Sequence, residues 1–445
     1  MKQNLLSLLL LLLFPSVNNA QCWQKIDAGF AHTAAILSDG SLWTWGGIGT
    51  GLGVSTNNPT QIGSSTDWLD VSAGGYHTLL IKTDGTLWAW GNNLFGQLGD
   101  GTTTPRTLPV QIGNDNNWLK VAAGESHSLG IKSDGTLWAW GTNAAGEIGN
   151  ATSSGTYTSP IQIGTENNWS KIQAGTSISI AIKSDGSLWS WGDNFFGALG
   201  LGNNIPKNIP TQVGTSNNWD KISCTFTYCH AIKTDGTLWA WGDNQQFNLG
   251  DGTNIEKNAP IQIGSANWLS VECGNYHVLA IKSDNTLWSW GLNNRGQLGN
   301  GTLTNGVTPT QVGSSQNWQS VSAGTTFSLG TQSDSSLFTW GYNQNGQLGD
   351  NTFINKSTPT SITCTNLGEA DYANSSVYLF TNPSHNFVIF NQKINEVEVF
   401  TSEGKKIAYY SNTDNINVSH LSSGIYILLL KDENGKLFRE KLLKN

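Results

Sequence analysis

The stretch DGTLWAWG at residues 84–91 decides the fold of this chain, because close copies of it occur six more times. The second Trp of the Trp-x-Trp-Gly core recurs at steps of 45 to 51 residues. It occupies positions Trp45, Trp90, Trp140, Trp191, Trp241, Trp290 and Trp340. A fixed period of this length indicates one supersecondary unit that buries its apolar face only against neighbouring copies.

The remaining tryptophans keep the same period. The first Trp of the pair is present in six copies and is Phe338 in the last, and a further Trp opens every repeat. The opening series is Trp23, Trp68, Trp118, Trp169, Trp219, Trp268 and Trp318. Together these positions account for all 20 tryptophans. We therefore expect the indoles to fill the space between neighbouring units.

Each repeat contains four short apolar or alternating runs bounded by Gly, Asp or Pro, which are typical of β-strands. In the second repeat they lie around Val71, Leu79–Ile81, Leu87–Trp90 and Gln111–Ile112. An Asp-Gly pair precedes the Trp pair in five repeats and predicts a two-residue hairpin with positive φ at both turn positions. The last two repeats have Asp284-Asn285 and Asp334-Ser335 there. Four antiparallel strands in each of seven units predict an all-β chain with a seven-bladed β-propeller, and an open solenoid is the alternative.

The two ends of the repeat array predict how the ring closes. The array begins at Trp23 and ends at Pro359–Ile362, a segment that precedes an opening Trp in the other repeats. We therefore expect one blade to combine strands from both ends. The same reasoning places Cys22 beside Cys364 and predicts a disulfide, with a ceiling of about 5 kcal/mol for so long a loop.

The other cysteines leave their pairing open. Cys224 and Cys273 share one repeat position in neighbouring blades, so they are candidates for a second disulfide that leaves Cys229 over. The alternative is that all three are small buried hydrophobic side chains.

The N-terminus has the pattern of a secretory signal peptide. Lys2 precedes an apolar run over residues 5–14, and small residues lead to Ala20. We expect cleavage after Ala20 and an exported protein without a transmembrane segment. Charged residues are 12%, the net charge is −8 and no basic run is present, so nucleic acid is not expected as a partner. The sequence has no metal or phosphate motif, and no cofactor is expected.

The order Ala-Gly-x-x-His, Asp-Gly-x-Leu-Trp-x-Trp-Gly and Gly-Gln-Leu-Gly resembles the regulator of chromosome condensation repeat over residues 22–364. The resemblance implies a seven-bladed propeller. Family members differ in function: the eukaryotic namesake is a nuclear exchange factor for the GTPase Ran, and a secreted bacterial member inhibits a β-lactamase. The signal peptide and the missing basic tail disfavour guanine-nucleotide exchange for this chain.

The end of the chain lacks Trp and the repeat, and it resembles the type A C-terminal sorting domain of the type IX secretion system. The resemblance rests on Asn-Pro, Gly-Lys and Val-Ser-x-Leu-x-x-Gly-Ile-Tyr segments, with the motif residues Asn382, Pro383, Gly404, Lys405, Leu421, Gly424 and Tyr426. It implies export by that secretion machinery in a Bacteroidetes-type bacterium, followed by release or attachment at the cell surface. Alternating strands predict a small β-sandwich here.

These observations divide the chain into four segments. We expect a signal peptide at 1–20, the propeller at 21–364, a linker at 365–373 and the sorting domain at 374–445.

Four histidines share one repeat position without predicting a metal site. They are His32, His77, His127 and His277, and the other blades have Ile178, Tyr228 and Phe327 there. Equivalent positions in different blades lie on a circle too wide for the bonds of one ion. The replacement by Ile and Phe favours a packing and hydrogen-bonding role.

Loops that depart from the repeat hold the candidate binding residues. Aromatic side chains and Arg at a rim are typical of binding interfaces. The candidates are Phe30, Tyr76, Phe95, Phe226, Tyr276, Arg295 and Tyr342. We expect a secreted or cell-surface binding protein, not an enzyme, that takes an unidentified protein or glycan as partner. The alternative is an extracellular enzyme or enzyme inhibitor that uses one propeller face.

Overall fold

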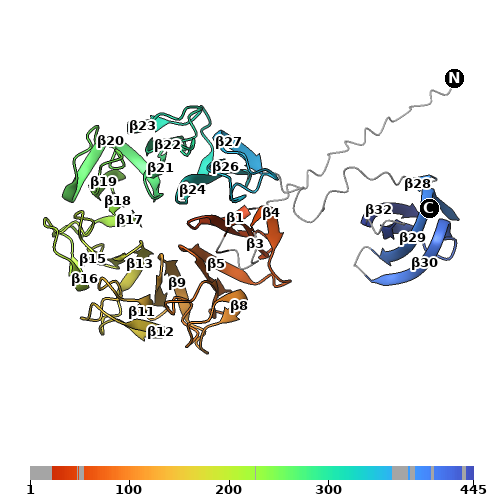
Figure 1. Cartoon of the computed structure of the whole chain (residues 1–445), viewed down its shortest axis with the longest axis horizontal. Coiled ribbons are helices and arrows are strands. Elements are labelled where there is room, and N and C mark those ends of the chain that lie inside the picture. The colour runs from red at the N-terminus through yellow and green to blue at the C-terminus, as the bar shows by residue number, and fades with distance from the viewer. Residues whose placement is uncertain are drawn as a thin grey trace, which may run out of the picture. The chain divides into compact units, whose positions relative to one another are not determined.

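The computed structural model of the chain describes residues 23–47, 49, 55–225, 227–362, 379–380, 386–401, 405–432 and 437–444. The chain divides into two compact units, Met1–Cys364 and Thr365–Asn445. The described residues form strands and turns with no helix. In the first unit the sheets are arranged around a central axis (Figure 1).

Every repeat folds as a four-stranded antiparallel meander whose first strand is innermost (Figure 1). The first strands are β1 (Trp23–Ala28), β5 (Trp68–Ala73), β9 (Trp118–Ala123), β13 (Trp169–Ala174), β17 (Trp219–Cys224), the end of β20 (Lys257–Cys273) and β24 (Trp318–Ala323). The second strands are β2 (His32–Leu37), β6 (His77–Lys82), β10 (His127–Lys132), β14 (Ile178–Lys183), β18 (Tyr228–Lys233), β21 (His277–Lys282) and β25 (Phe327–Gln332).

The third strands carry the Trp pair. They are β3 (Leu42–Gly46), β7 (Leu87–Gly91), β11 (Leu137–Thr142), β15 (Leu188–Gly192), β19 (Thr237–Gly242), β22 (Leu287–Gly291) and β26 (Leu337–Gly341). The outermost strands are β4 (Thr56–Gln61), β8 (Arg106–Gln111), β12 (Thr156–Gln162), β16 (Lys207–Gln212), the start of β20, β23 (Gly306–Gln311) and β27 (Lys356–Ile362). Strand β20 is shared by two neighbouring blades, so their strands form one hydrogen-bonded series from β17 to β23. The prediction of an all-β propeller is confirmed.

The hairpins between second and third strands differ from the predicted two-residue turns. In the second repeat, Gly85 N donates to Lys82 O at 2.9 Å and Lys82 N donates to Thr86 O at 3.1 Å, which closes a three-residue loop. Gly85 has a φ of +79°, whereas Asp84 does not take a positive φ. The prediction of positive φ at both positions is therefore wrong. Asp84 instead accepts hydrogen bonds from Thr86 N and Oγ1, as Asp commonly does in turns.

The second Trp of each pair is fully buried and joins its blade to the preceding one. Its indole Nε1 donates to a backbone carbonyl of that blade at 2.8–3.0 Å in all seven repeats. Trp140, for example, donates to Gln97 O at 2.8 Å. In six repeats the acceptor is the second residue of the Gly-Gln-Leu-Gly segment or of its counterpart, so these two motifs form one interblade contact. For Trp90 the acceptor is Gly49 O.

The predicted blade with strands from both ends is wrong. Strand β27 pairs with β26 in the sheet that begins with β24, and β1 begins a separate sheet. The reason is that each repeat, read from its opening Trp, already contains all four strands of its sheet. The first and last sheets instead meet through Trp45 Nε1 to Gln347 O at 2.9 Å, Ala28 N to Ser322 Oγ at 2.9 Å and Asn351 N to Asn57 O at 2.8 Å.

The cysteines also differ from the prediction. Cys224 forms a disulfide with Cys229, and Cys273 is a buried free thiol, so the proposed pairing of Cys224 with Cys273 is wrong. Cys224 and Cys229 are direct partners across β17 and β18, with Cα atoms 4.2 Å apart. Cys22 and Cys364 lie outside the described residues, and their pairing stays a prediction.

The C-terminal unit forms one sheet around its own core. Its strands are β28 (Leu379–Phe380), β29 (Phe387–Thr401), β30 (Lys406–Asn417), β31 (Gly424–Lys431) and β32 (Leu437–Lys444). The order is β28-β29-β31-β32, with β30 paired to the long strand β29. The register of β29 and β30 breaks between Ile389 and Ile394, and alternating apolar residues of both strands enter the core.

The predicted sorting-motif residues have different places in this unit. Tyr426 is a buried core residue whose hydroxyl donates to Ser422 O at 3.0 Å, and Leu421 packs against the same core. Lys405 lies in the hairpin between β29 and β30, and Gly424 begins β31. Asn382, Pro383 and Gly404 lie outside the described residues.

Candidate functional site

The innermost strands form the wall of a central channel, and each has an edge without a strand partner. Side chains at one repeat position satisfy several of these edges by reaching the next blade. Ser72 Oγ accepts from Ala123 N at 3.0 Å, and Ser223 Oγ accepts from Cys273 N at 2.9 Å. Asp27 Oδ2 accepts from Ala73 N at 2.8 Å. Hydrogen bonds to the backbone of the next blade therefore hold these side chains in place.

Two of these residues, Asp27 and Glu272, are half-buried carboxyl groups. Burial raises the pKa of Asp27 to about 6, although hydrogen bonds from Ala73 N and the Ser322 hydroxyl oppose the shift. Burial also raises the pKa of Glu272 to about 8, and the nearby charge of Asp27 contributes in the same direction. Glu272 accepts a hydrogen bond from Ser223 Oγ at 3.2 Å. The channel wall thus holds two carboxyl groups, and the raised pKa of Glu272 favours its protonated form.

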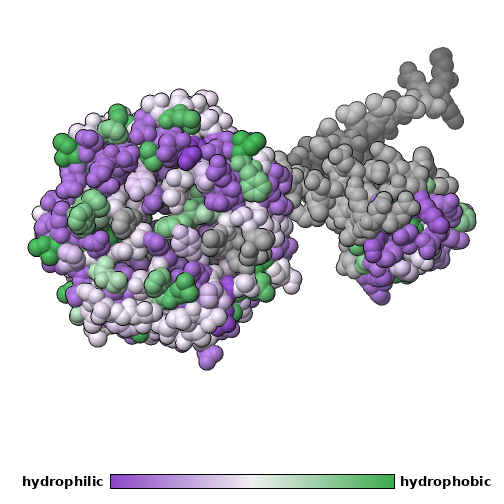
Figure 2. All heavy atoms as spheres, in the orientation of Figure 1, coloured by the Kyte–Doolittle hydropathy of each residue, from purple (hydrophilic) through white to green (hydrophobic). Residues whose placement is uncertain are grey.

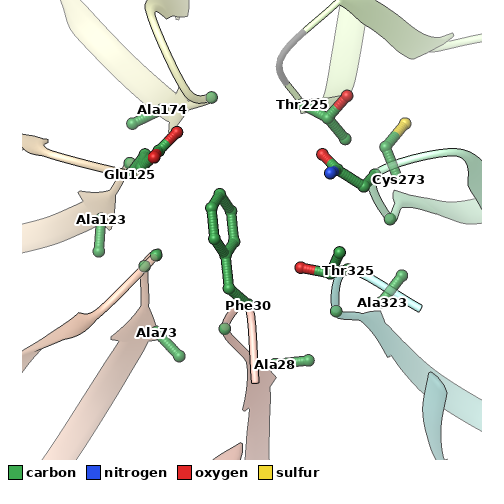
Figure 3. A pocket seen from close by; sticks show the side chains of 18 of the residues that line it. Ala28, Phe30, Ala73, Ala123, Glu125, Ala174, Thr225, Cys273, Ala323 and Thr325 are labelled. Atoms are coloured by element: carbon green, nitrogen blue, oxygen red, sulfur yellow. The ribbon is translucent and has the colours of Figure 1, made fainter. Parts of the chain in front are cut away.

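The channel end that follows these strands is narrow. We call it the loop-side mouth; it is formed by the Ala-Gly-x segments, including Gly29–Phe30, Gly74–Gly75, Gly124–Glu125, Gly175–Thr176, Gly274–Asn275 and Gly324–Thr325. Backbone bonds such as Gly75 N to Gly124 O at 2.9 Å link neighbouring segments. Phe30 points into the centre of the mouth (Figure 3). The cavity there is about 90 Å³, enough for a few water molecules.

The histidines of the repeat lie between blades instead of facing the channel. His127 Nε2 is 2.9 Å from Ser179 Oγ, and that hydroxyl donates to Glu147 O at 2.7 Å, so the ring nitrogen is the donor. The ring packs over Gly124, where a Cβ would lie 2.7 Å from ring atoms. Burial lowers the pKa of His127 to about 4. Among the residues that the structure describes, no group of three or more His, Cys, Asp or Glu is arranged to hold a metal ion.

The predicted rim aromatics do not form one continuous patch. Phe30 packs edge to face on Tyr76, with ring centroids 5.6 Å apart. The Arg295 guanidinium lies 5.4 Å from the Tyr342 ring centroid. Phe95 is 47% exposed in its own loop. Phe226 lies outside the described residues. Figure 2 accordingly shows apolar side chains in separate patches around a central hollow.

Tyr276 lies in a larger cavity of about 450 Å³, which we call the aromatic–amide cavity. Three successive blades contribute Phe196, Thr227, Asp243, Gln245, Gln246, Tyr276, Leu292 and Asn294. Phe195 is 70% exposed beside it and packs edge to face on Phe196 at 4.9 Å. The sequence predicts Tyr276 as a candidate but does not predict the amide side chains, because the cavity depends on which loops meet across a seam.

The buried Asn of each Trp-Gly-x-Asn segment holds the loop that follows. In the fifth repeat Asn244 Nδ2 donates to Thr253 O at 2.8 Å and to Ile255 O at 3.3 Å. Its Oδ1 accepts from Leu249 N at 2.9 Å. The Asp243 carboxylate accepts from Gln245 N at 3.0 Å. These bonds fix the backbone that presents Gln245 and Gln246, so the cavity is largely formed before any ligand arrives.

Comparison with known proteins agrees with this architecture. The RCC1-like domain matches residues 119–394, and the regulator of chromosome condensation (RCC1) repeat matches residues 39–81 and 84–131. The secretion system C-terminal sorting domain matches residues 378–445. A search of the curated proteins found no match. The structure has no helix among its described residues that is long and apolar enough to cross a bilayer.

Solved structures with the same fold are distant in sequence. Human WBSCR16 is 20% identical with a TM-score of 0.64, and the alignment covers 69% of this chain and 84% of that one. Yeast RCC1 (Prp20), solved with Kap60 bound, is 18% identical with a TM-score of 0.65 over 81% of this chain and 88% of that one. At this identity the likeness shows the fold alone. The chain belongs to the RCC1-like domain family and carries a C-terminal sorting domain that indicates secretion or attachment at the cell surface.

Proposed function

We propose that this protein is a secreted, non-enzymatic binding protein that holds a partner protein or glycan against the loops on one face of its propeller. The aromatic–amide cavity carries the proposal. It combines the aromatic rings of Phe196 and Tyr276 with neutral amides from Gln245, Gln246 and Asn294. Aromatic surface supplies contact area, and amides both donate and accept hydrogen bonds, which matches peptide groups and sugar hydroxyls.

The scaffold supports such a role. The interblade Trp contacts and the Asn-centred loop bonds order the cavity in the free protein, so little conformational entropy is lost on binding. The sorting domain implies contact with the secretion machinery during export. A signal peptide at 1–20 and a Bacteroidetes-type source are part of the same proposal.

The test uses the purified full chain on a glycan array and in pull-downs with envelope and secreted proteins. For the partner found, Phe196→Ala and Tyr276→Ala should each weaken binding at least about tenfold, as expected for residues central to an interface. The matched controls are Phe95→Ala and Tyr76→Ala, because these residues occupy the same repeat positions in another blade. Equal losses in the controls, or no saturable partner, would contradict the proposal.

One observation favours an extracellular enzyme as the second candidate. Asp27 and Glu272 are carboxyl groups of one channel wall, and their pKa values are raised to about 6 and about 8, respectively. Carboxyl pairs with different pKa values serve as acid and base in enzymes. Saturable turnover of a substrate by the full chain, lost in Glu272→Gln, would favour this candidate. Guanine-nucleotide exchange stays disfavoured, because the sorting domain favours a secreted or cell-surface protein.

A further inference from the structure

The channel end opposite Phe30 has a different chemistry. All innermost strands run in the same direction, so the residues just after each opening Trp gather at this end. The second residue after that Trp is Lys25, Asp70, Lys120, Lys171, Lys221, Ser270 or Ser320. Four lysines thus converge in a chain whose net charge is −8. The residue just before this repeat position is an exposed Leu in three blades, at Leu69, Leu119 and Leu269.

Three of the four lysines have partners in the next blade. Lys25 forms an ion pair with Asp70, and Lys171 forms one with Asp220. Lys221 donates to the carbonyl oxygen of Leu269. These contacts occupy three ammonium groups and both carboxylates.

Lys120 is different because its neighbours do not compensate its charge. The next blade has Ser170 and Lys171 where the partners of the other lysines lie. No ion pair or side-chain hydrogen bond joins Lys120 to another residue in the described part of the chain. Partial burial, together with the charges of Lys171 and Lys25, lowers the pKa of Lys120, and Asp70 opposes this only partly. An added anion would relieve this repulsion.

Lys120 borders a cavity of about 390 Å³ at this end of the channel. Leu69 and Leu119 form its apolar rim, and Val121 and Ile172 line it further. The ion pair of Lys25 with Asp70 also lines the cavity, so the Asp70 carboxylate is already neutralised there. Leu69 is 47% exposed and Leu119 is 54% exposed, so each leaves a large apolar side chain in water beside a single free ammonium group. A ligand that satisfies both features needs one negative charge next to an apolar group.

We propose that this cavity binds an acidic peptide segment of a partner protein, with a carboxylate on the Lys120 ammonium and a neighbouring aliphatic side chain against Leu69 and Leu119. A carboxylate matches one ammonium group in charge, and a charge-assisted hydrogen bond gives the contact its strength. Phosphate carries more charge and is usually bound by several donors, and the remaining lysines of this ring are already bonded. The site lies at the other end of the channel from the loop-side mouth and does not depend on the aromatic–amide cavity.

The experiment measures fluorescence anisotropy of labelled peptides with the full chain. A peptide of alternating Glu and Leu should bind saturably, more weakly as the salt rises from about 50 to about 300 mM, because salt screens the ion pair. A Gln-Leu peptide of the same length should not bind. Lys120→Gln should weaken binding at least about tenfold. The matched control Lys221→Gln, at the same repeat position with an ammonium already bonded to Leu269 O, should change it less than about threefold.

Circular dichroism and the unfolding midpoint confirm that both variants are folded. Equal affinity for the Gln-Leu peptide, or an unchanged affinity in Lys120→Gln, would overturn the proposal. Binding of inorganic phosphate without any binding of the Glu-Leu peptide would also overturn it. Phe196→Ala should leave this peptide's affinity unchanged, so a failure here is distinguishable from a failure of the loop-face function.

Discussion

The seams between blades and the two mouths of the channel obey different rules. Every seam repeats one set of contacts, in which a buried Trp bonds to the preceding blade and a His, Ile, Tyr or Phe fills the same slot over a small residue. At the mouths, the residue at one repeat position changes from blade to blade. Phe30, Glu125 and Asn275 share such a position at one end, and Lys120 lies at another position at the other end. The repeat therefore specifies the scaffold, and the residues that depart from it specify the surface chemistry.

The largest effect expected at the seams is acid destabilisation. Burial lowers the pKa of His127 to about 4 and of His77 to about 3, so both rings stay neutral in the folded protein. Below pH 6.5 the unfolded chain binds protons that the folded protein does not, and the free energy of unfolding falls as the pH falls. The slope is about 1.4 kcal/mol per pH unit for each such histidine. Denaturant midpoints measured from pH 7 to pH 4 test this.

The channel carboxyls act in the opposite direction. The pKa of Asp27 is raised to about 6 and that of Glu272 to about 8, so their contribution is present at low pH and is lost as the pH rises through these values. His127→Ile, which copies Ile178 of the next blade, should flatten the acid slope by one proton. Equal slopes in the unmodified chain and in His127→Ile would contradict the seam account.

The next largest effect comes from the Trp pair. Trp140→Ala removes a fully buried indole and its bond to Gln97 O, and it should lower the free energy of unfolding by about 3–5 kcal/mol. Trp138→Phe, which copies Phe338 of the last repeat, should cost less than about 1.5 kcal/mol. Chemical denaturation of both variants measures the difference. Similar losses of unfolding free energy in the two variants would show that the first and second Trp of the pair do not differ in role.

The disulfide predicts a smaller effect in the fifth blade. Reduction of the Cys224–Cys229 bond should lower stability by about 2 kcal/mol, the entropy expected for so short a loop. The double variant C224A/C229S restores residues that other repeats carry at these positions and serves as the control. Its response to reductant should be smaller than that of the unmodified chain by this amount. An identical response would show that the bond contributes nothing to stability.

The smallest effect is expected in the hairpins. Ser335 has a φ of +64° where five repeats have Gly, so Ser335→Gly should stabilise the protein by about 1 kcal/mol. The reverse change, Gly135→Ser, should destabilise it, because a Cβ there would lie 2.0 Å from Asn167 O. Thermal midpoints of the two variants should move in opposite directions. Movement in the same direction would contradict the assigned turn geometry.

The period of the tryptophans predicts the strands, the propeller and the filling of the seams, because burial of large rings depends on local pattern and repetition. The prediction of a shared blade is wrong because the outermost strand belongs to the repeat before it, as the pairing of β27 with β26 shows. The Cys224–Cys229 pair could have been found from the hairpin register of β17 and β18, which places the two residues opposite each other.

The sites were harder to predict because they depend on contacts between repeats. Gln245 and Gln246 line a cavity only because Phe196 and Tyr276 reach it from the blades on either side. For Lys120 the sequence did contain a signal: the next repeat has Lys171 where Lys25 finds Asp70. Comparing each residue with its equivalent in the following repeat would have revealed the uncompensated charge.

An experimental map of the full chain at side-chain resolution tests the closed ring most directly, at the junction of the first and last sheets. We predict that Trp45 Nε1 donates to Gln347 O and that Ala28 N donates to Ser322 Oγ, with β27 paired only to β26. A map in which β1 and β27 share a sheet, or in which Trp45 does not contact the last sheet, would contradict the account.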